Sequence, residues 1–299
     1  MAISRIRRSN LYGNQWKAYL FILPAFIIYS IFIIYPFLRT IYLTFFSGIG
    51  TKATHFSGIQ NYINVISDKV FWNAFRNNIS WAVMVLIIPV CFGLFLAVLL
   101  SRSKLNGRTF FRTVLFFPQV ITPVIVAMIW RWMYSPGFGP INVLLTDIGL
   151  GSLAHGWLGN SGQALPALAI GYSWAYYGFC MVIFIAALQG VDETLYDAAK
   201  IDGANAIQEF WNVTLPGIRF AMTTVLLFTV IESFKIFDIV YVATRGGPGY
   251  ATWVISYYVY DYTWNQFKVG YGATAAVLQT VFVGLITTLF IWYRRRLKE

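Results

Sequence analysis

The sequence predicts an all-α membrane protein with six transmembrane helices. Of its 299 residues, 58% are hydrophobic and only 11% are charged, whereas soluble domains carry about 25% charged residues. This composition excludes soluble domains of any size. Six apolar segments each have about the 20 residues needed to cross a bilayer. They cover residues 18–37, 79–100, 114–133, 164–188, 220–242 and 274–293.

The basic residues orient these six segments in the membrane. If the N-terminus lies in the cytoplasm, fourteen lysine and arginine residues fall in cytoplasmic segments and seven in outer segments. Because cytoplasmic loops are enriched in Lys and Arg, both termini and the loop 190–219 are predicted to be cytoplasmic. The predicted organisation is a basic tail over 1–17, a first helix and outer loop over 18–75, a transmembrane domain over 76–293, and a basic tail over 294–299.

A net charge of +11 raises the question of nucleic-acid binding. The basic residues, however, flank apolar spans in short groups and form no continuous patch with exposed aromatic residues. Contact with anionic lipid headgroups explains the charge more simply. We therefore expect membrane lipid, and no nucleic acid, among the partners. Cys91 and Cys180 lie far apart within predicted spans, so neither a disulfide nor a metal or cofactor site is predicted.

Proline and glycine residues modify two of the predicted elements. Pro118 and Pro123 are expected to kink the third span, which is tolerated where neighbouring helices satisfy the freed carbonyls. In the outer segment 134–163, a turn rich in Pro and Gly precedes the apolar-periodic residues 141–148. This pattern predicts a short helix lying on the outer surface.

Residues 192–216 form a polar segment, rich in small residues, between the fourth and fifth spans. Asp192 is a favourable N-cap for a first short helix, which Gly203 is expected to end. Asn205 and the glutamine three positions later match a capping box for a second short helix, which Pro216 is expected to close. The small residues leave one side open to close approach by another protein.

This polar segment resembles the EAA loop of permease subunits in binding-protein-dependent ABC importers. About 20 residues match in type and spacing, and the one departure is Asp197, where the family usually has glutamate, so the carboxylate is kept. In that family the loop inserts into a cleft of the ATPase subunit, and the resemblance implies the same role here. The implied coupling residues are Tyr196, Asp197, Ala198, Ala199, Asp202, Gly203, Ala204, Phe210, Leu215 and Pro216.

The fifth span carries three ionisable side chains, Glu232, Lys235 and Asp238. Each would cost roughly 2.5 to 3.5 kcal/mol at mid-bilayer, so the three cannot all face lipid. Glu232 and Lys235 lie three positions apart and can pair on one helix face. The charges either line a water-filled cavity or form an ion-paired packing cluster, and the sequence leaves both interpretations open.

A second resemblance covers the end of this span and the turn that follows. The matching residues are 233–238, Tyr241, Thr244 and the turn Gly246-Gly247-Pro248-Gly249, and they resemble the maltose-type branch of ABC permeases. This implies the type I permease fold and import of a di- or oligosaccharide, a glycosylated polyol or a glycerol phosphate. It further implies a second related permease, two ATPase subunits that use ATP and Mg, an extracytoplasmic solute-binding protein, and the cytoplasmic membrane of a bacterium or archaeon.

A sugar pathway needs flat apolar faces together with polar groups. Aromatic residues of the fourth span could supply both, although most membrane aromatics pack or form interfacial belts. The predicted pathway residues are Trp174, Tyr176, Tyr177, Glu232, Phe234, Lys235 and Asp238. The turn Gly246, Gly247, Pro248 and Gly249, with positive φ expected at its glycines, is either a tight loop or a docking surface for the binding protein.

Other functional classes can be compared with this interpretation. The sequence has no G-x-x-x-x-G-K-[ST] phosphate loop, so ATP hydrolysis is assigned to partner subunits and no catalytic residue is predicted. An ion-coupled secondary transporter is the alternative, and it would be expected to show broken helices or inverted repeats. A membrane enzyme would need clustered carboxylates or histidines, and five of the 11 acidic residues fall in the polar segment 192–216.

Overall fold

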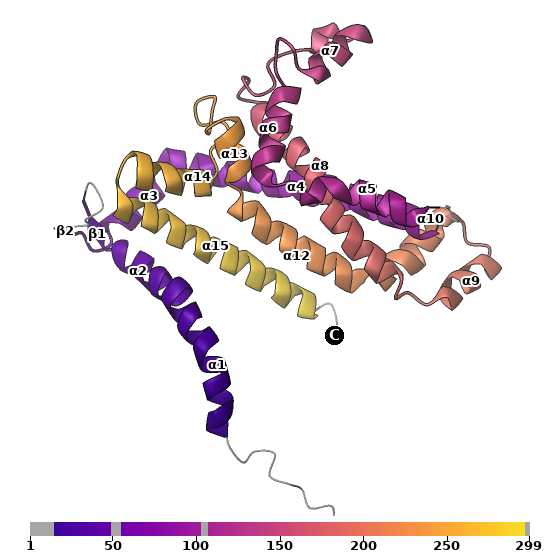
Figure 1. The fold of residues 1–299 in the computed structure, drawn as a ribbon, viewed down its shortest axis with the longest axis horizontal. Helices are drawn as coiled ribbons and strands as arrows, with labels where there is room; N and C mark the ends of the chain where they lie inside the picture. Colours follow the sequence, from indigo (N-terminus) through magenta and orange to yellow (C-terminus); the bar gives the residue numbers. More distant parts are fainter. Residues whose placement is uncertain (1–14, 49–54, 103–106, 297–299) are drawn as a thin grey trace, which may run out of the picture.

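The computed structural model describes residues 15–48, 55–102 and 107–296, so the predicted tail 1–17 lies almost entirely outside the described residues. Helices dominate this part of the chain (Figure 1). Four helices there are long and apolar enough to cross a membrane, and two sharply bent helix pairs raise the number of candidate spans to six at most. The structure thus agrees with a helical membrane protein.

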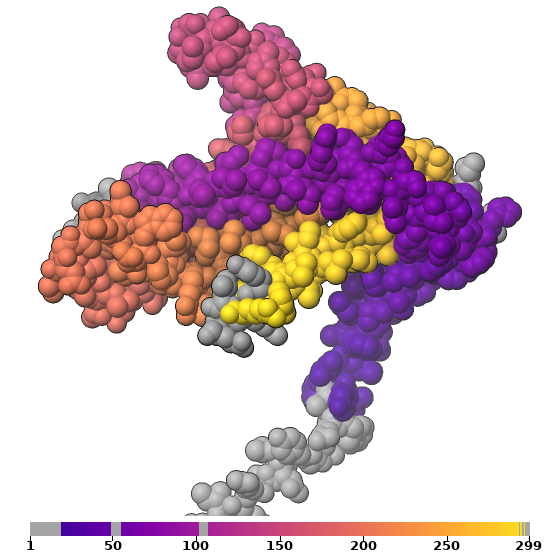
Figure 2. All heavy atoms as spheres, turned by 180° about the vertical axis from the view of Figure 1, so that it is seen from behind, coloured from indigo at the N-terminus to yellow at the C-terminus, as the bar shows by residue number. Residues whose placement is uncertain are grey.

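The first apolar segment forms a rod that projects from the rest of the molecule (Figures 1 and 2). Its parts are α1 (Gln15–Tyr29), the π-helical turn η1 (Ser30–Ile34) and α2 (Tyr35–Leu43). The rod continues beyond the predicted end at residue 37, and none of its most apolar stretch is buried. A short antiparallel pairing follows, between β1 (Phe46–Ser47) and β2 (His55–Phe56).

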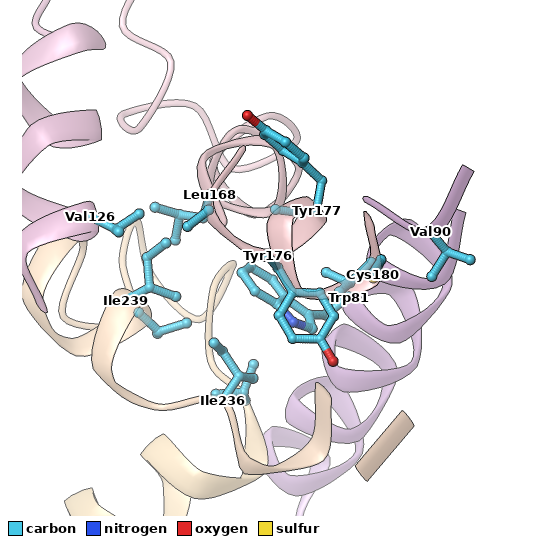
Figure 3. Close-up of a cluster of buried hydrophobic side chains, with 14 of the residues drawn as sticks. Trp81, Val90, Val126, Leu168, Tyr176, Tyr177, Cys180, Ile236 and Ile239 are labelled. Atoms are coloured by element: carbon cyan, nitrogen blue, oxygen red, sulfur yellow. The ribbon is translucent and has the colours of Figure 1, made fainter. Parts of the chain in front are cut away.

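The centre of the fold is the pair α4 (Lys69–Arg102) and α8 (Ala164–Leu188), with α3 (Gln60–Ser67) preceding α4. The two long helices run parallel, because Trp81 contacts Tyr172 near their beginnings and Gly93 contacts Cys180 further along. A Cβ on Gly93 would lie 2.7 Å from the Cβ of Cys180. Glycine therefore lets the helices approach closely. Their buried side chains, together with others from the rest of the core such as Val126 and Ile239, form the cluster drawn in Figure 3.

The third span is broken into two helices. They are α5 (Arg108–Val120) and α6 (Pro123–Met133), and their axes differ by 93°. Pro118 lies inside α5 without ending it. Pro123 occupies the first turn of α6, where a backbone N–H would have no carbonyl acceptor within the helix, so proline is tolerated. The predicted kink is thus a full break at residues 121–122, because both halves pack on α8 separately.

Outside this core, α7 (Pro140–Asp147) and a 3₁₀ turn (Gly151–Leu153) stand apart from the long helices (Figure 1). The predicted short helix over 141–148 is confirmed. Buried Asn142 ties α7 to the loop that follows it. Its side-chain N–H donates to the carbonyl of His155, and its side-chain oxygen accepts from the indole N–H of Trp157 at 2.9 Å.

The chain after α8 forms several short helices, and the fifth predicted span is not one helix. The segment 192–217, which precedes this span, forms α9 (Glu193–Ile201), α10 (Ala206–Glu209), η3 (Phe210–Thr214) and α11 (Leu215–Gly217). The rest of the chain forms α12 (Arg219–Lys235), α13 (Asp238–Ala243), α14 (Ile255–Tyr260), η4 (Asp261–Asn265) and α15 (Val269–Arg296). The continuous helix predicted over 220–242 is therefore wrong, because the chain leaves helical geometry at residues 236–237.

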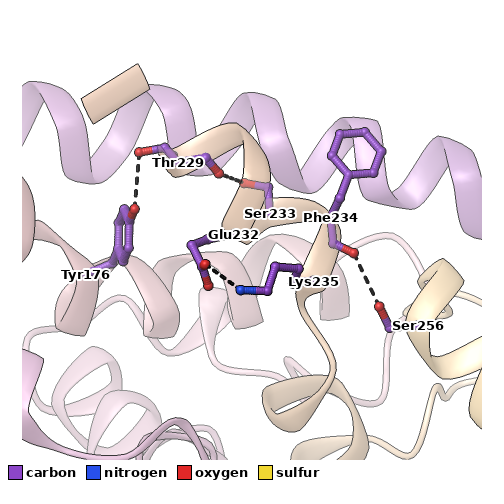
Figure 4. A network of polar contacts seen from close by, with 7 residues as sticks. All are labelled: Tyr176, Thr229, Glu232, Ser233, Phe234, Lys235 and Ser256. Atoms are coloured by element: carbon purple, nitrogen blue, oxygen red, sulfur yellow. Dashed lines mark hydrogen bonds and ion pairs between the residues drawn. The ribbon is translucent and has the colours of Figure 1, made fainter. Parts of the chain in front are cut away.

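Side chains from three other helices satisfy the carbonyls that this interruption frees. The amide of Asn78 on α4 donates to Ser233 O at 3.1 Å, and its oxygen accepts from the N–H of Ile255 at 2.7 Å. The hydroxyl of Ser256 on α14 donates to Phe234 O at 3.2 Å (Figure 4), and Gln279 on α15 donates to the same carbonyl. The break is thus a bonded junction of α4, α12, α14 and α15.

A second polar cluster fastens α15 to the start of α4. The carboxylate of Asp68 accepts hydrogen bonds from the hydroxyls of Tyr258 at 2.6 Å, Tyr262 at 3.1 Å and Tyr271 at 3.1 Å. Burial raises the pKa of this carboxyl, but these bonds and the N–H of Val70 outweigh it, so the pKa is lowered. Asp68 is therefore held as a carboxylate.

Adding one methyl group at the α4–α8 contact tests the packing of the core. We expect Gly93→Ala to lower the free energy of unfolding by about 1–3 kcal/mol, because the new Cβ would overlap backbone and side-chain atoms of α8. Thermal unfolding of the purified chain in detergent, followed by tryptophan fluorescence, measures this change. Gly284→Ala on α15 is the control, since nothing lies within 4 Å of its Cβ. Equal stability of the two variants would contradict the assigned contact.

Candidate functional site

The segment 192–217, called the coupling segment below after its predicted role, is capped at the start of both of its first two helices. The side chain of Asp192 accepts from the N–H of Thr194 at 2.9 Å, and this hydrogen bond lowers the pKa of the carboxyl. In the predicted capping box, the Asn205 side chain accepts from Gln208 N and the Gln208 side chain accepts from Asn205 N, each at 2.9 Å. Both predicted N-caps are confirmed.

The turn between the two short helices depends on glycine. Helix α9 ends at Ile201, and Gly203 has φ +74°, a left-handed conformation that side chains rarely adopt. Pro216, predicted to close the second helix, does not do so. It lies in the first turn of α11, where proline is tolerated, and the chain turns by 72° only after Gly217.

One part of the coupling segment is anchored and the other is exposed. Tyr196 donates to Thr214 at 3.4 Å, and Phe210 and Leu215 pack against the core. In contrast, Asp197, Ala198, Asp202 and Gly203 are exposed, while Ala199 and Ala204 are half-buried. Large apolar side chains also face outward, with Ile201 exposed at 86%; the others are Leu195, Ile207 and Trp211. An exposed apolar surface of this kind is typical of a contact site for another protein or for a membrane.

Charged side chains flank the interruption after α12. The ammonium of Lys235 lies 2.7 Å from the carboxylate of Glu232, and the two side chains remain 63% and 41% exposed (Figure 4). Lys235 lies in the last turn of α12 and exposed Asp238 in the first turn of α13. Each charge therefore complements the dipole of its helix end. Phe234 is buried within the protein, unlike these three side chains.

A pocket of about 310 Å³ lies between α12, α8 and the break in the third span. Glu232 and Phe228 line it from α12, and Tyr172, Tyr176 and Phe179 line it from α8. The rings of Tyr172 and Tyr176 stack with centroids 5.3 Å apart, and the Tyr176 hydroxyl accepts from Thr229 at 3.4 Å (Figure 4). Flat rings beside a carboxylate can bind the faces and hydroxyls of a polar organic solute.

Of the four aromatic residues predicted for this pathway, including Phe234, only Tyr176 lines the pocket. Trp174 contacts the ring of Trp130, and Tyr177 is buried against Phe92 on α4. Sequence reasoning missed Tyr172 and Phe179 and the polar Gln119 of α5. The signal was available for two of them, because residues 172, 176 and 179 are spaced i, i+4, i+7 on one helix face.

The turn 246–249, called the outer turn below after its predicted location, is built against α14. Gly246 and Gly249 have φ +81° and +58°, as predicted, whereas Gly247 does not have a positive φ. A Cβ on Gly246 would meet the rings of Trp253 and Tyr257, so glycine is required there. The hydroxyl of Thr252 closes the turn by donating to Gly247 O at 2.9 Å.

Across residues 15–48, 55–102 and 107–296, no three His, Cys, Asp or Glu side chains converge on a potential metal site.

Known proteins are similar to this chain in sequence and in fold. The osmoprotective compounds uptake permease protein GgtC of Synechocystis is 35% identical over 285 residues, covering 93% of this chain and 98% of its own. The lactose transport system permease protein LacF of Rhizobium radiobacter is 33% identical over 292 residues, covering 95% of each chain. A crystal structure of a bacterial ABC transporter that imports the acidic polysaccharide alginate has a chain of the same fold, with TM-score 0.83, 22% identity, and coverage of 95% and 96%.

A family model extends this likeness over most of the sequence. The model described as binding-protein-dependent transport system inner membrane component matches residues 90–298. This match includes the coupling segment, the pocket and the outer turn 246–249. The chain therefore belongs to the family of binding-protein-dependent transport system inner membrane components, as an ABC transporter permease.

Proposed function

We propose that this chain is one of two related permeases in an ATP-driven importer that moves a sugar-type solute across the cytoplasmic membrane of a bacterium or archaeon. The solute class is a di- or oligosaccharide, a glycosylated polyol or a glycerol phosphate. The relatives named for lactose and for osmoprotective compounds support this class. The pocket beside Glu232, with its stacked tyrosine rings, supports it as well.

The exposed apolar surface of the coupling segment carries the proposal. Ile201, Ile207 and Trp211 project from capped, rigid helices and would be buried in the cleft of a partner ATPase. Two such ATPase subunits would bind ATP and Mg and supply the energy, since this sequence has no phosphate-binding loop. The permease would convert their closure into a rearrangement of its helices.

The route of this motion is short. Phe210 and Leu215 pack on the core, and α12 begins at Arg219, directly after the coupling segment. Glu232, at the far end of α12, lines the pocket. A displacement of the coupling segment would therefore reorient the pocket wall, which is what alternating access requires.

The coupling segment would face the cytoplasm. The guanidinium of Arg294, near the end of α15, lies 5.1 Å from the ring of Phe220 at the start of α12. The last turns of α15 and the coupling segment thus share one face, which is also the face that the distribution of basic residues assigns to the cytoplasm. An extracytoplasmic binding protein would deliver solute to the opposite face, where the turn 246–249 would contact it. The family match and the relatives give no support to the ion-coupled alternative.

A charge placed in the coupling segment tests the contact with the ATPase. We expect Gly203→Asp to reduce ATP hydrolysis stimulated by loaded binding protein about tenfold or more. The aspartate would strain the left-handed backbone at this position and place a charge on the docking surface. The assay uses the co-expressed complex in lipid nanodiscs. Gly149→Asp is matched, since Gly149 has φ +80° and open surroundings in the loop after α7. An equal loss in both variants would contradict the proposed contact.

The role of the Glu232–Lys235 pair is tested by neutralising one and then both partners. If the carboxylate binds solute hydroxyls, Glu232→Gln lowers sugar uptake into proteoliposomes about tenfold, since a hydrogen bond to a charged group is worth about 1.5–3 kcal/mol. The double variant Glu232→Gln with Lys235→Gln should be no better. Recovery of uptake in the double variant would instead show that the pair acts only by ion-pair packing.

A further inference from the structure

A basic groove of about 580 Å³ opens at the start of α4. Lys69 and Arg76 on the first two turns of α4 form one wall, and Pro248 of the outer turn with Tyr250 just after it forms another. Ser161, from the loop before α8, completes it. Three segments that are distant in the sequence therefore meet around two exposed cations.

The groove is a built structure. The amide of Asn73 donates to Tyr250 O at 2.7 Å, and the amide of Asn77 donates to the carbonyls of Tyr250, Ala251 and Trp253 at 2.9–3.2 Å. These bonds fix the segment that follows the outer turn on α4. The Asn73 oxygen also accepts from Arg76 at 3.4 Å, so the guanidinium lies beside this amide.

The two cations have no carboxylate partner within the described part of the chain. The ion pairs there join Lys200 to Asp197 and Lys235 to Glu232, both elsewhere. Asp68 precedes Lys69, but its carboxylate is bound by three tyrosine hydroxyls and lies beyond 4.0 Å of either cation. Lys69 also opens α4, where the helix dipole disfavours a cation and favours an anion.

The groove lies on the side of the membrane opposite the coupling segment. Helix α4 has 34 residues and is about 51 Å long at 1.5 Å per residue, well beyond a hydrocarbon core of about 30 Å. Five of its first ten residues are polar, namely Lys69, Asn73, Arg76, Asn77 and Asn78. Because the helix is longer than the hydrocarbon core, this end is the one that projects from the membrane. Helices α4 and α8 run parallel, and the end of α8 leads into the coupling segment. The start of α4 therefore lies on the side of the membrane opposite the coupling segment.

We infer that Lys69 and Arg76 form an anion-binding groove for an acidic side chain of the solute-binding protein that docks on the outer face. This inference rests on the proposed function and deepens it by naming the chemistry of that contact. The walls combine apolar side chains, among them Val70 and Pro248, with two cations, two asparagine amides and a serine hydroxyl. This mixture suits a protruding acidic loop better than a lipid acyl chain. Opposite charges across the interface would speed association and fix its register.

Charge reversal tests the groove. In the co-expressed complex in nanodiscs, Lys69→Glu and Arg76→Glu should each raise the Kd for the binding protein about tenfold, with unchanged basal ATP hydrolysis. Rising salt should weaken the wild type more than the variants. Lys268→Glu is the matched control, because Lys268 is exposed and lies outside the groove, with its ammonium 5.7 Å from the ring of Tyr262. Equal affinity of all variants and wild type would overturn the inference.

A carbodiimide, which joins an amine to a carboxylate in direct contact, identifies the occupant. Mass spectrometry should find Lys69 linked to an Asp or Glu of the binding protein, and Lys69→Arg should bind normally without that link. An affinity loss confined to nanodiscs with anionic lipid would assign the groove to lipid headgroups and overturn the inference. If the binding protein fails to stimulate even the wild-type complex, the proposed function itself is wrong.

Discussion

The rest of the structure depends on one constraint, that the backbone carbonyls freed where α12 stops inside the membrane segment must find donors. Lipid offers none, and an unsatisfied carbonyl there costs several kcal/mol. Asn78, Ser256 and Gln279 supply the donors from α4, α14 and α15. Because each donor comes from a different helix, satisfying the break also fixes where those helices lie. The pocket wall at Glu232 is positioned by the same junction.

The hydrogen bonds of this arrangement gather on one side of the molecule. The polar junction and the Asp68–tyrosine cluster fasten α4, α14 and α15 together. Helix α12 joins them at the junction, packs on α4 and α8, and follows the coupling segment directly in the chain. In the proposed transport cycle, a displacement of the coupling segment would pass along α12 to Glu232 at the pocket.

The two faces differ in the chemistry that they offer to partners. The coupling segment presents large apolar side chains from short capped helices, which suits insertion into a cleft. The opposite face presents Lys69 and Arg76 beside a turn fixed by asparagine side chains, which suits an anionic surface. The apolar contact favours a lasting subunit interface, whereas the charged contact favours rapid, salt-sensitive association. An ATPase subunit and a cycling binding protein would require these two kinds of interface.

Local patterns in the sequence determined the membrane class, the approximate spans, the N-caps at Asp192 and Asn205, and the glycine turn at Gly203. Such features depend on interactions between residues only a few positions apart, so they can be predicted from the sequence. The break at 236–237 contains neither proline nor glycine, and the sequence predicted an unbroken helix there. Only the tertiary structure decided it, because the replacement donors lie more than 20 residues away along the chain. The choice of Tyr176 over Tyr177 for the pocket had the same origin, since packing against α4 decides which face of α8 remains open.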